Sequence, residues 1–168
     1  MSKQCIPLLE KGCVRLRLLE RTDLGTTLSW RNENRRWFLN SDLLSIDSHC
    51  SWFEQYIARN DDYVFIIEQL SERIEPTGQI SLYKIDWEQR KAEFGRLLIV
   101  ESARQKGVAK KAIEILLEYA FDTLGIKTIH LEVLQSNHPA ISLYEKCGFV
   151  HTEELGSRII MTRSSEGR

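Results

Sequence analysis

The sequence has few of the features that mark exported, membrane-spanning or metal-binding proteins. Its 168 residues include only 4 cysteines and 3 prolines, and no cysteines stand in a CxxC or similar ligand spacing. No run of about 18 apolar residues occurs, so a membrane-spanning helix is not expected. The start, MSKQCIPLLEKG, has no apolar stretch of the kind found in signal peptides, so export is not expected. We therefore expect a cytoplasmic protein without a metal site, with reduced thiols at Cys5, Cys13, Cys50 and Cys147.

An excess of charge of one sign is also lacking. The 23 Lys and Arg nearly balance the 24 Asp and Glu, which leaves a net charge of -1. No overall field then draws the protein to nucleic acid or to an acidic membrane, and any anion site must be local. The phosphate-binding patterns GxGxxG and GxxxxGK[ST] are absent as well. The length and ordinary composition suit a single domain over residues 1–168.

Alternating and helical apolar patterns follow one another along the chain and predict a mixed α/β sheet. The hairpin between the second and third strands is expected to close through a loop at 71–78. We expect strands at 14–20, 63–70, 79–86, 91–100 and 127–133, two further strands after Gly148, and helices at 22–31, 48–58, 108–124 and 139–147.

One stretch, ESARQKGVAKK at Glu101–Lys111, places four cations between an expected strand and an expected helix. A helix N-terminus has unpaired N–H groups and carries about half a positive charge, and a phosphate satisfies both. Gly107 would let the backbone approach such a ligand closely. From these residues alone, a phosphate site and a solvated basic helix start are both open interpretations.

Taken with a second motif, this stretch resembles the signature of the GNAT superfamily of N-acetyltransferases. Arg104–Ala109 reads RQKGVA, which is similar to the family pattern R/Q-x-x-G-x-G/A at the start of a long helix. Leu131–Phe149 reads LEVLQSNHPAISLYEKCGF, which resembles a strand, an Asn and then A-x-x-L-Y-x-x-x-G-F. The resemblance is good over 78–154. It extends more weakly into the N-terminal third, which is similar to the ribosomal-protein and amino-sugar-nucleotide N-acetyltransferases.

The resemblance implies a GNAT-like fold, in which helices flank a mixed, mostly antiparallel central sheet with splayed central strands. Those strands would be Phe94–Val100 and Lys127–Val133, with acetyl-CoA between them and residues 78–154 as its binding core. Their unpaired backbone groups would bond the pantetheine, and the turn would hold the pyrophosphate. No metal is implied, because the amine attacks the thioester directly. The expected cofactor-binding residues are Leu98, Ile99, Val100, Arg104, Gln105, Lys106, Gly107, Val108, Ala109, Lys110 and Asn137.

The reaction needs a neutral amine, a hydrogen-bond donor for the oxyanion and a proton for the leaving thiolate. The resemblance implies that Tyr144 supplies that proton, whereas outside the motif it would be a core aromatic residue. Glu93 is the first candidate for the base, on the expectation that apolar neighbours raise its pKa. His130 and a water chain remain alternatives. Asn137 could equally cap the helix that follows it.

The N-terminal part, residues 12–60, is implied as the acceptor side. Arg and aromatic residues suit a phosphorylated, ring-bearing amine, so a nucleotide-linked amino sugar is expected first and a protein N-terminal amine second. Polyamines would want an acidic pocket, and Asp61 and Asp62 are too small a patch for one. A non-catalytic acyl-CoA-binding module stays open, and the resemblance allows a homodimer. The aromatic residues could instead be core, and His49 could lie on a helix surface. The acceptor candidates are Trp30, Arg31, Asn32, Arg35, Arg36, Trp37, Phe38, His49, Trp52 and Phe53.

Overall fold

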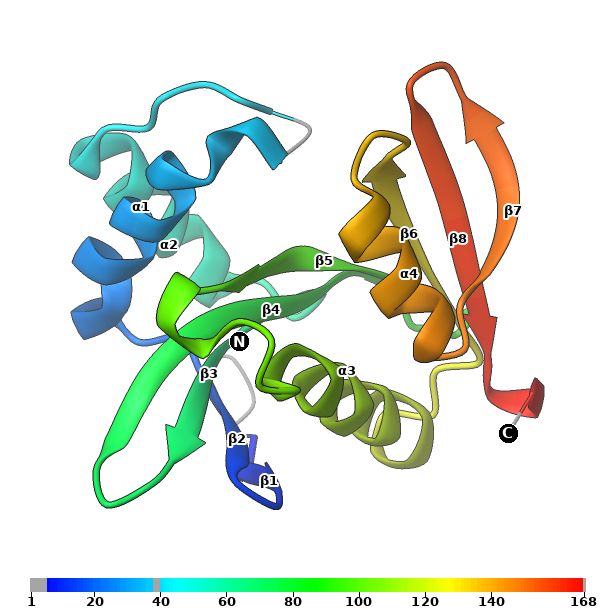
Figure 1. The fold of residues 1–168 in the computed structure, drawn as a ribbon, viewed down its shortest axis with the longest axis horizontal. Coiled ribbons are helices and arrows are strands. Elements are labelled where there is room, and N and C mark those ends of the chain that lie inside the picture. The colour runs from blue at the N-terminus through cyan, green and yellow to red at the C-terminus, as the bar shows by residue number, and fades with distance from the viewer. Residues whose placement is uncertain (1–5, 38–39, 168) are drawn as a thin grey trace.

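A single sheet organises the part of the chain described by the structure, a computed structural model that covers residues 6–37 and 40–167. Within these residues eight strands pair in the order β1-β2-β3-β4-β5-β6-β8-β7 (Figure 1). All neighbours are antiparallel except β5 and β6, which confirms the predicted mixed, mostly antiparallel sheet. The strands are β1 (Leu9–Lys11), β2 (Val14–Leu18), β3 (Asp62–Leu70), β4 (Ile74–Asp86), β5 (Lys91–Ile99), β6 (Thr128–Leu134), β7 (Val150–Leu155) and β8 (Arg158–Ser164).

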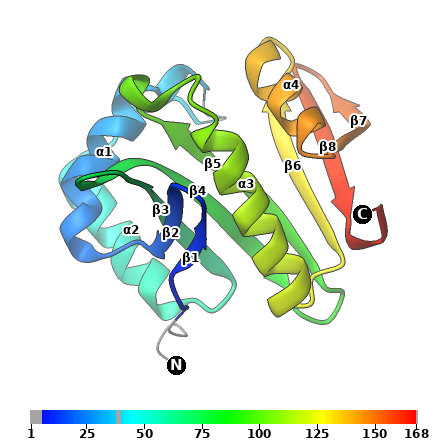
Figure 2. The same ribbon diagram turned by 60° about the horizontal axis from the view of Figure 1, so that its bottom comes forward.

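Four α-helices of the described residues cover the two faces of this sheet. They are α1 (Leu24–Glu33), α2 (Ile46–Ala58), α3 (Val108–Glu118) and α4 (His138–Lys146). Short 3-10 turns lie at Arg21–Asp23, Arg35–Trp37, Glu101–Ala103 and Ser165–Gly167, and α3 continues into one π turn at Tyr119–Thr123. Figure 2 shows α3 lying along one face of the sheet. The predicted helices are all present, and Ser45 caps α2 by accepting a hydrogen bond from the N–H of Ser48.

The alternation of β3 divides the core between the two faces. Phe65 and Ile67 belong to the larger cluster, which includes the apolar stripe of α3. Val64 and Ile66 belong to the smaller cluster, which is completed by α1 and α2. A strand whose side chains are buried on both faces of a sheet has apolar residues at consecutive positions, as the start of the segment 63–70 does. The helices at residues 12–60 therefore pack on the opposite face from α3.

The two central strands separate after a short paired stretch. β5 and β6 pair in parallel only at Lys91 with Thr128, Ala92 with Ile129 and Glu93 with His130. Beyond these pairs the strands diverge, and Figure 1 shows them running apart towards α1 and α4. The predicted splay of the central strands is confirmed, and it leaves backbone groups on both strands without a neighbouring strand.

Some boundaries differ from the sequence-based expectation. β4 begins at Ile74, so the expected loop at 71–78 is wrong at its C-terminal end. β1 carries only three residues and was not expected. β5 also contains a bulge, because two of its residues, Arg96 and Leu97, lie opposite a single residue of β4. Arg96 has φ of +52°, as a bulge residue can.

The remaining sequence expectations concern cysteines, metals and membranes. Cys13, Cys50 and Cys147 are free thiols, and Cys5 and Phe38 lie outside the described residues. No group of three or more potential metal ligands gathers anywhere in 6–37 or 40–167. Among the helices of those residues, none has the length and apolar character needed to cross a membrane.

Candidate functional site

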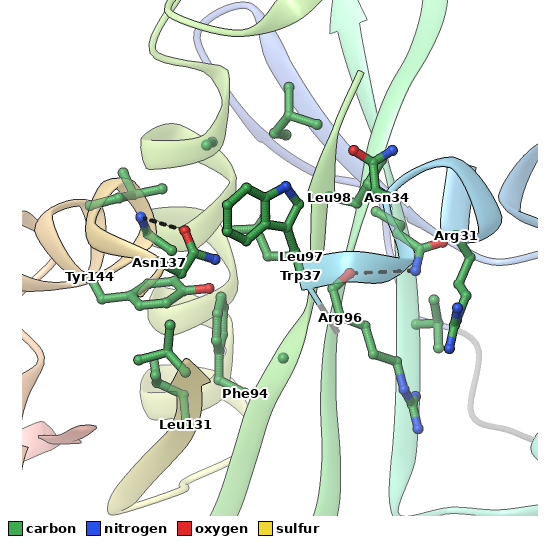
Figure 3. Close-up of a pocket in the computed structure, with 18 of the residues that line it drawn as sticks. Arg31, Asn34, Trp37, Phe94, Arg96, Leu97, Leu98, Leu131, Asn137 and Tyr144 are labelled. Carbon is green, nitrogen blue, oxygen red and sulfur yellow. Dashed lines mark hydrogen bonds between the residues drawn. The ribbon is translucent and has the colours of Figure 1, made fainter. Parts of the chain in front are cut away.

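A cavity of about 1110 Å³ opens where β5 and β6 diverge. One of its walls is the start of α3 and another is α4, and on the far side it reaches α1 and α2. Figure 3 shows Tyr144 and Asn137 on one side of this cavity, Arg31 and Asn34 on the other, and the indole of Trp37 in the middle, next to Asn137. Sequence segments that were predicted separately as a coenzyme core and an acceptor side thus border one continuous space.

The turn before α3 has the backbone geometry of an anion site. Gly107 is the N-cap of α3 with φ of +74°, and Gln105 has φ of +61°. The first main-chain hydrogen bond of the helix runs from the N–H of Lys111 to the carbonyl of Gly107, so the preceding N–H groups lack helical partners. A Cβ built on Gly107 would meet no protein atom within 4 Å. The space beside these amides is therefore open to a ligand.

The four cationic side chains of this turn differ in their interaction partners. Arg104 donates through Nε to the carbonyl of Ile99 at 3.0 Å and through Nη2 to Asn34 Oδ1 at 3.0 Å. Lys110 lies 3.8 Å from Glu114, and Lys111 donates to Cys13 Sγ at 3.4 Å. Lys106 is exposed, and no ion pair involves it within the described chain. The charge at the turn is therefore largely tied to neighbouring protein groups.

Most of the predicted coenzyme-binding residues border the cavity. These are Leu98, Ile99, Arg104, Gln105, Gly107, Val108, Ala109, Lys110 and Asn137. Val100 and Lys106 are not among the lining residues, and the N–H of Val100 bonds the carbonyl of Thr77 at 2.9 Å. Asn137 caps α4, because its Oδ1 accepts from the N–H of Ala140 at 3.3 Å, as drawn in Figure 3. This cap leaves the amide nitrogen of Asn137 on the cavity side.

Tyr144 is buried by α4 with its hydroxyl directed into the cavity (Figure 3). Its ring packs edge-on against Phe94 at 5.7 Å and against Phe149 at 6.0 Å between centroids. Burial raises the pKa of Tyr144, so the phenol keeps its proton at neutral pH. Within residues 6–37 and 40–167, no protein group hydrogen-bonds the hydroxyl. The phenol is thus rigidly held with its polar atom available to a ligand.

Glu93 lies at the last paired position before the strands diverge, and it is buried. Its Oε1 accepts from the Tyr83 hydroxyl at 2.5 Å, and its Oε2 accepts from Lys84 Nζ at 2.6 Å. His130 Nε2 lies 3.7 Å from Oε2. Burial acts to raise the pKa of Glu93, but the contacts with His130, Lys84 and Tyr83 outweigh it and lower the pKa to about 2. The expectation that apolar neighbours raise this pKa is wrong.

The acceptor candidates divide into cavity and core residues. Arg31, Arg36, Trp37, His49 and Trp52 line the cavity. The side chain of Asn32 instead bonds the backbone of Leu44, and Phe53 is a core residue. Neither Trp30 nor Arg35 is among the lining residues. The interpretation of His49 as a surface residue is wrong, because only 8% of it is exposed.

Sequence reasoning missed a polar cluster at the bulge of β5. The guanidinium of Arg96 bonds the buried carboxylate of Asp62 through two N–H groups, at 2.7 and 3.1 Å. It also lies over the ring of Tyr83, 4.3 Å from the centroid. Gly95 makes room for this tyrosine, since a Cβ there would lie 2.8 Å from the Tyr83 hydroxyl. A signal existed in the sequence, because a glycine and an arginine inside an apolar strand are typical of a bulge.

Comparison with known proteins gives a family match over most of the chain. The model described as the acetyltransferase (GNAT) domain matches residues 14–150. A spermidine N(1)-acetyltransferase of Vibrio cholerae is 33% identical over 144 residues, which make up 83% of this chain and 80% of that protein.

Solved structures agree with this match. The crystal structure of spermidine N-acetyltransferase from Vibrio cholerae in complex with CoA and spermine has a TM-score of 0.83 at 28% identity, with 92% of this chain and 96% of that chain covered. FdhC, described as a nucleotide-linked sugar GNAT, has a TM-score of 0.84 at 25% identity, with 95% and 90% covered. The chain is thus similar both to a polyamine enzyme and to a sugar-nucleotide enzyme.

Proposed function

Because the chain belongs to the acetyltransferase (GNAT) family and is an N-acetyltransferase that uses acetyl-CoA, we propose that its acceptor is a small molecule bearing both a primary amine and an anionic group. A nucleotide-linked amino sugar is the first candidate. The observation that carries this proposal is the charge of the acceptor side, where Arg31 and Arg36 line the cavity. Arg31 donates to the backbone carbonyls of Asn40 and Asp42. Arg36 lies over the ring of Trp37, 4.9 Å from its centroid.

The described residues fit acetyl-CoA as substrate. The N–H groups at the start of α3 and the open space beside Gly107 suit a pyrophosphate. The parted edges of β5 and β6 suit the pantetheine amides, which can pair with a strand edge as an added strand would. We assign residues 78–154 to coenzyme binding and residues 12–60 to the acceptor side.

Three groups of this chain would serve the reaction. Tyr144 would give its proton to the thiolate that leaves, since its phenol is protonated and its hydroxyl faces the cavity. Backbone N–H groups of β5 near Ile99, next to the bulge, would donate to the oxyanion. Glu93, with a pKa of about 2, is ionised at neutral pH and paired with Lys84, so it would orient His130, 3.7 Å away, and His130 or water would take the proton that the acceptor ammonium loses.

A polyamine acceptor is the second candidate, and two observations favour it. The Vibrio cholerae relative is named a spermidine N(1)-acetyltransferase. The carboxylates of Glu93 and Glu132 also line the cavity and could receive ammonium groups. Against it, Lys84 contacts Glu93 and Arg158 donates to Glu132 at 2.8 Å, so neither carboxylate is unpaired. The guanidinium groups at the acceptor side would then repel a cation.

The other expectations from the sequence carry less weight. A protein N-terminal amine is a further candidate acceptor for the same cavity. A non-catalytic acyl-CoA-binding module would have no use for the cavity-facing hydroxyl of Tyr144. Location in the cytoplasm and pairing of two copies stay predictions.

The test is a screen for acetyl transfer by mass shift and by release of free CoA thiol. The acceptors would be uridine-diphosphate-linked amino sugars, spermidine and a short peptide with a free N-terminus. We expect the highest kcat/KM with an amino-sugar nucleotide, since its diphosphate meets the guanidinium groups. A preference for spermidine would select the second candidate. Tight acetyl-CoA binding without turnover of any amine would overturn the proposal in favour of a binding module.

A further inference from the structure

His49 of α2 is a nearly buried residue on the acceptor side of the cavity, and the mechanism above does not use it. Only 8% of the residue is exposed, yet it is one of the residues that line the cavity. Its ring stacks on the indole of Trp52, with 5.2 Å between centroids and 13° between planes. This stack fixes the plane of the imidazole and therefore the directions in which its two nitrogens point.

The hydrogen bonds of Thr27 decide which nitrogen of His49 carries the proton. Thr27 Oγ1 lies 3.0 Å from the carbonyl of Asp23 and 3.3 Å from the carbonyl of Leu24. It also lies 3.0 Å from His49 Nε2. Carbonyl oxygens only accept, and the two carbonyls near Oγ1 favour placing the single hydroxyl proton of Thr27 on them. Thr27 Oγ1 then accepts from His49, which assigns the ring proton to Nε2 and leaves Nδ1 with a lone pair.

The Nδ1 atom of His49 is not shut off from solvent. Within residues 6–37 and 40–167, no protein group hydrogen-bonds Nδ1. Among the side-chain nitrogen and oxygen atoms of those residues that are fully buried, Ser81 Oγ alone lacks a hydrogen-bond partner. Since Nδ1 lacks a partner and is not among the fully buried atoms, we infer that a ligand in the cavity that His49 lines can reach it. Burial, followed by the nearby charge of Arg31, lowers the pKa of His49, so the ring is neutral and can accept.

We propose that His49 determines acceptor specificity by accepting a hydrogen bond at Nδ1 from an O–H or N–H donor of the acceptor, while Thr27 and Trp52 hold its ring. This inference rests on the proposed function. A ligand group that only accepts, such as a phosphate oxygen, finds no partner at Nδ1. The position therefore suits a sugar hydroxyl or the amine itself, with the anionic part of the acceptor lying towards the guanidinium groups.

Two isosteric variants separate this role from a structural one. In His49→Asn, an amide oxygen stands where Nδ1 was, so the acceptor on the cavity side is kept and the contact with Thr27 is lost. In His49→Gln, the amide reaches the place of Nε2, so the contact with Thr27 is kept and the acceptor on the cavity side is lost. For the amine found in the screen, we expect KM to rise about tenfold in His49→Gln and about threefold or less in His49→Asn. The Kd for acetyl-CoA should stay unchanged in both.

A direct readout of the tautomer accompanies the kinetics. In the spectrum of ¹⁵N-histidine-labelled protein, identified by the loss of signals in His49→Gln, His49 should show a protonated Nε2 and an unprotonated Nδ1, and Nδ1 should shift when the acceptor binds. Equal KM in the parent and His49→Gln, a larger loss in His49→Asn, or a protonated Nδ1 would each overturn the inference. Absence of turnover in the parent would instead overturn the proposed function, and this inference with it.

Discussion

The two ends of the cavity are built from different parts of the chain. At the start of α3, backbone geometry makes the site: Gly107 and Gln105 have positive φ, and the first N–H groups of the helix are unpaired. At the acceptor end, side chains from α1, α2 and β5 make the site, and many of them are tied to one another, as Arg96 is to Asp62. A backbone site tolerates changes of side chain but not of conformation, whereas a side-chain site shows the opposite behaviour.

Tyr144 stands between the two ends, and its variant should have the largest effect. We expect Tyr144→Phe to lower kcat by about 100-fold or more, because the phenol is the proposed proton donor to the leaving sulfur. Since the hydroxyl has no protein partner, its removal should change the free energy of unfolding by less than about 0.5 kcal/mol. Release of free CoA thiol would measure kcat, calorimetry with acetyl-CoA would measure coenzyme binding, and urea unfolding would measure the free energy of unfolding. An unchanged kcat would remove Tyr144 from the mechanism.

Gly107→Val tests the coenzyme end. The substitution puts a branched Cβ into the open space beside the amides and forces a β-branched residue to φ of +74°. We expect the Kd for acetyl-CoA to rise about 10- to 100-fold, which corresponds to the loss of one charge-assisted hydrogen bond. Calorimetric titration of the variant with acetyl-CoA would measure this change.

Gly156→Val is the matched control for this variant. Gly156 has φ of +61° and open space around its Cβ position, but it lies in the turn between β7 and β8. Both variants should lose a similar free energy of unfolding, about 1–2 kcal/mol, from the strained backbone. Only the variant at Gly107 should lose affinity. Equal losses of affinity would mean that strain, and not the ligand, explains the effect.

The same comparison explains what could be predicted from sequence. The coenzyme end was predictable because a glycine, a helix stripe and a second motif are local in sequence, and the parted strands followed from the family resemblance. The lowered pKa of Glu93 was not predictable, because its partners Tyr83 and Lys84 come from β4 and contact it across the sheet. His49 was judged a surface residue because its burial depends on the packing of α2 onto α1 and β3.

Glu93→Gln tests a buried charge at the point where β5 and β6 separate. Because the pKa of Glu93 is lowered from 4.5 to about 2, its stabilising effect is fully present above pH 4.5 and is lost as the pH falls towards 2. We expect the variant to be less stable than the parent by about 1–3 kcal/mol at pH 7, with the difference shrinking below pH 4.5. Urea unfolding at pH 7, 4.5 and 3 would show this. A difference that is the same at all three values would contradict the depressed pKa.

Lys106→Ala should have the smallest effect, and it probes the backbone interpretation most directly. Lys106 is exposed, makes no ion pair in the described chain and does not line the cavity, although the sequence motif places it in the turn. An exposed charge contributes about 0.2–1 kcal/mol, so the Kd for acetyl-CoA should rise by less than about fivefold, and less again at high salt. A rise as large as that of Gly107→Val would show that the turn holds its ligand by side-chain charge. A small, salt-sensitive rise would leave the amides of α3 as the main contact.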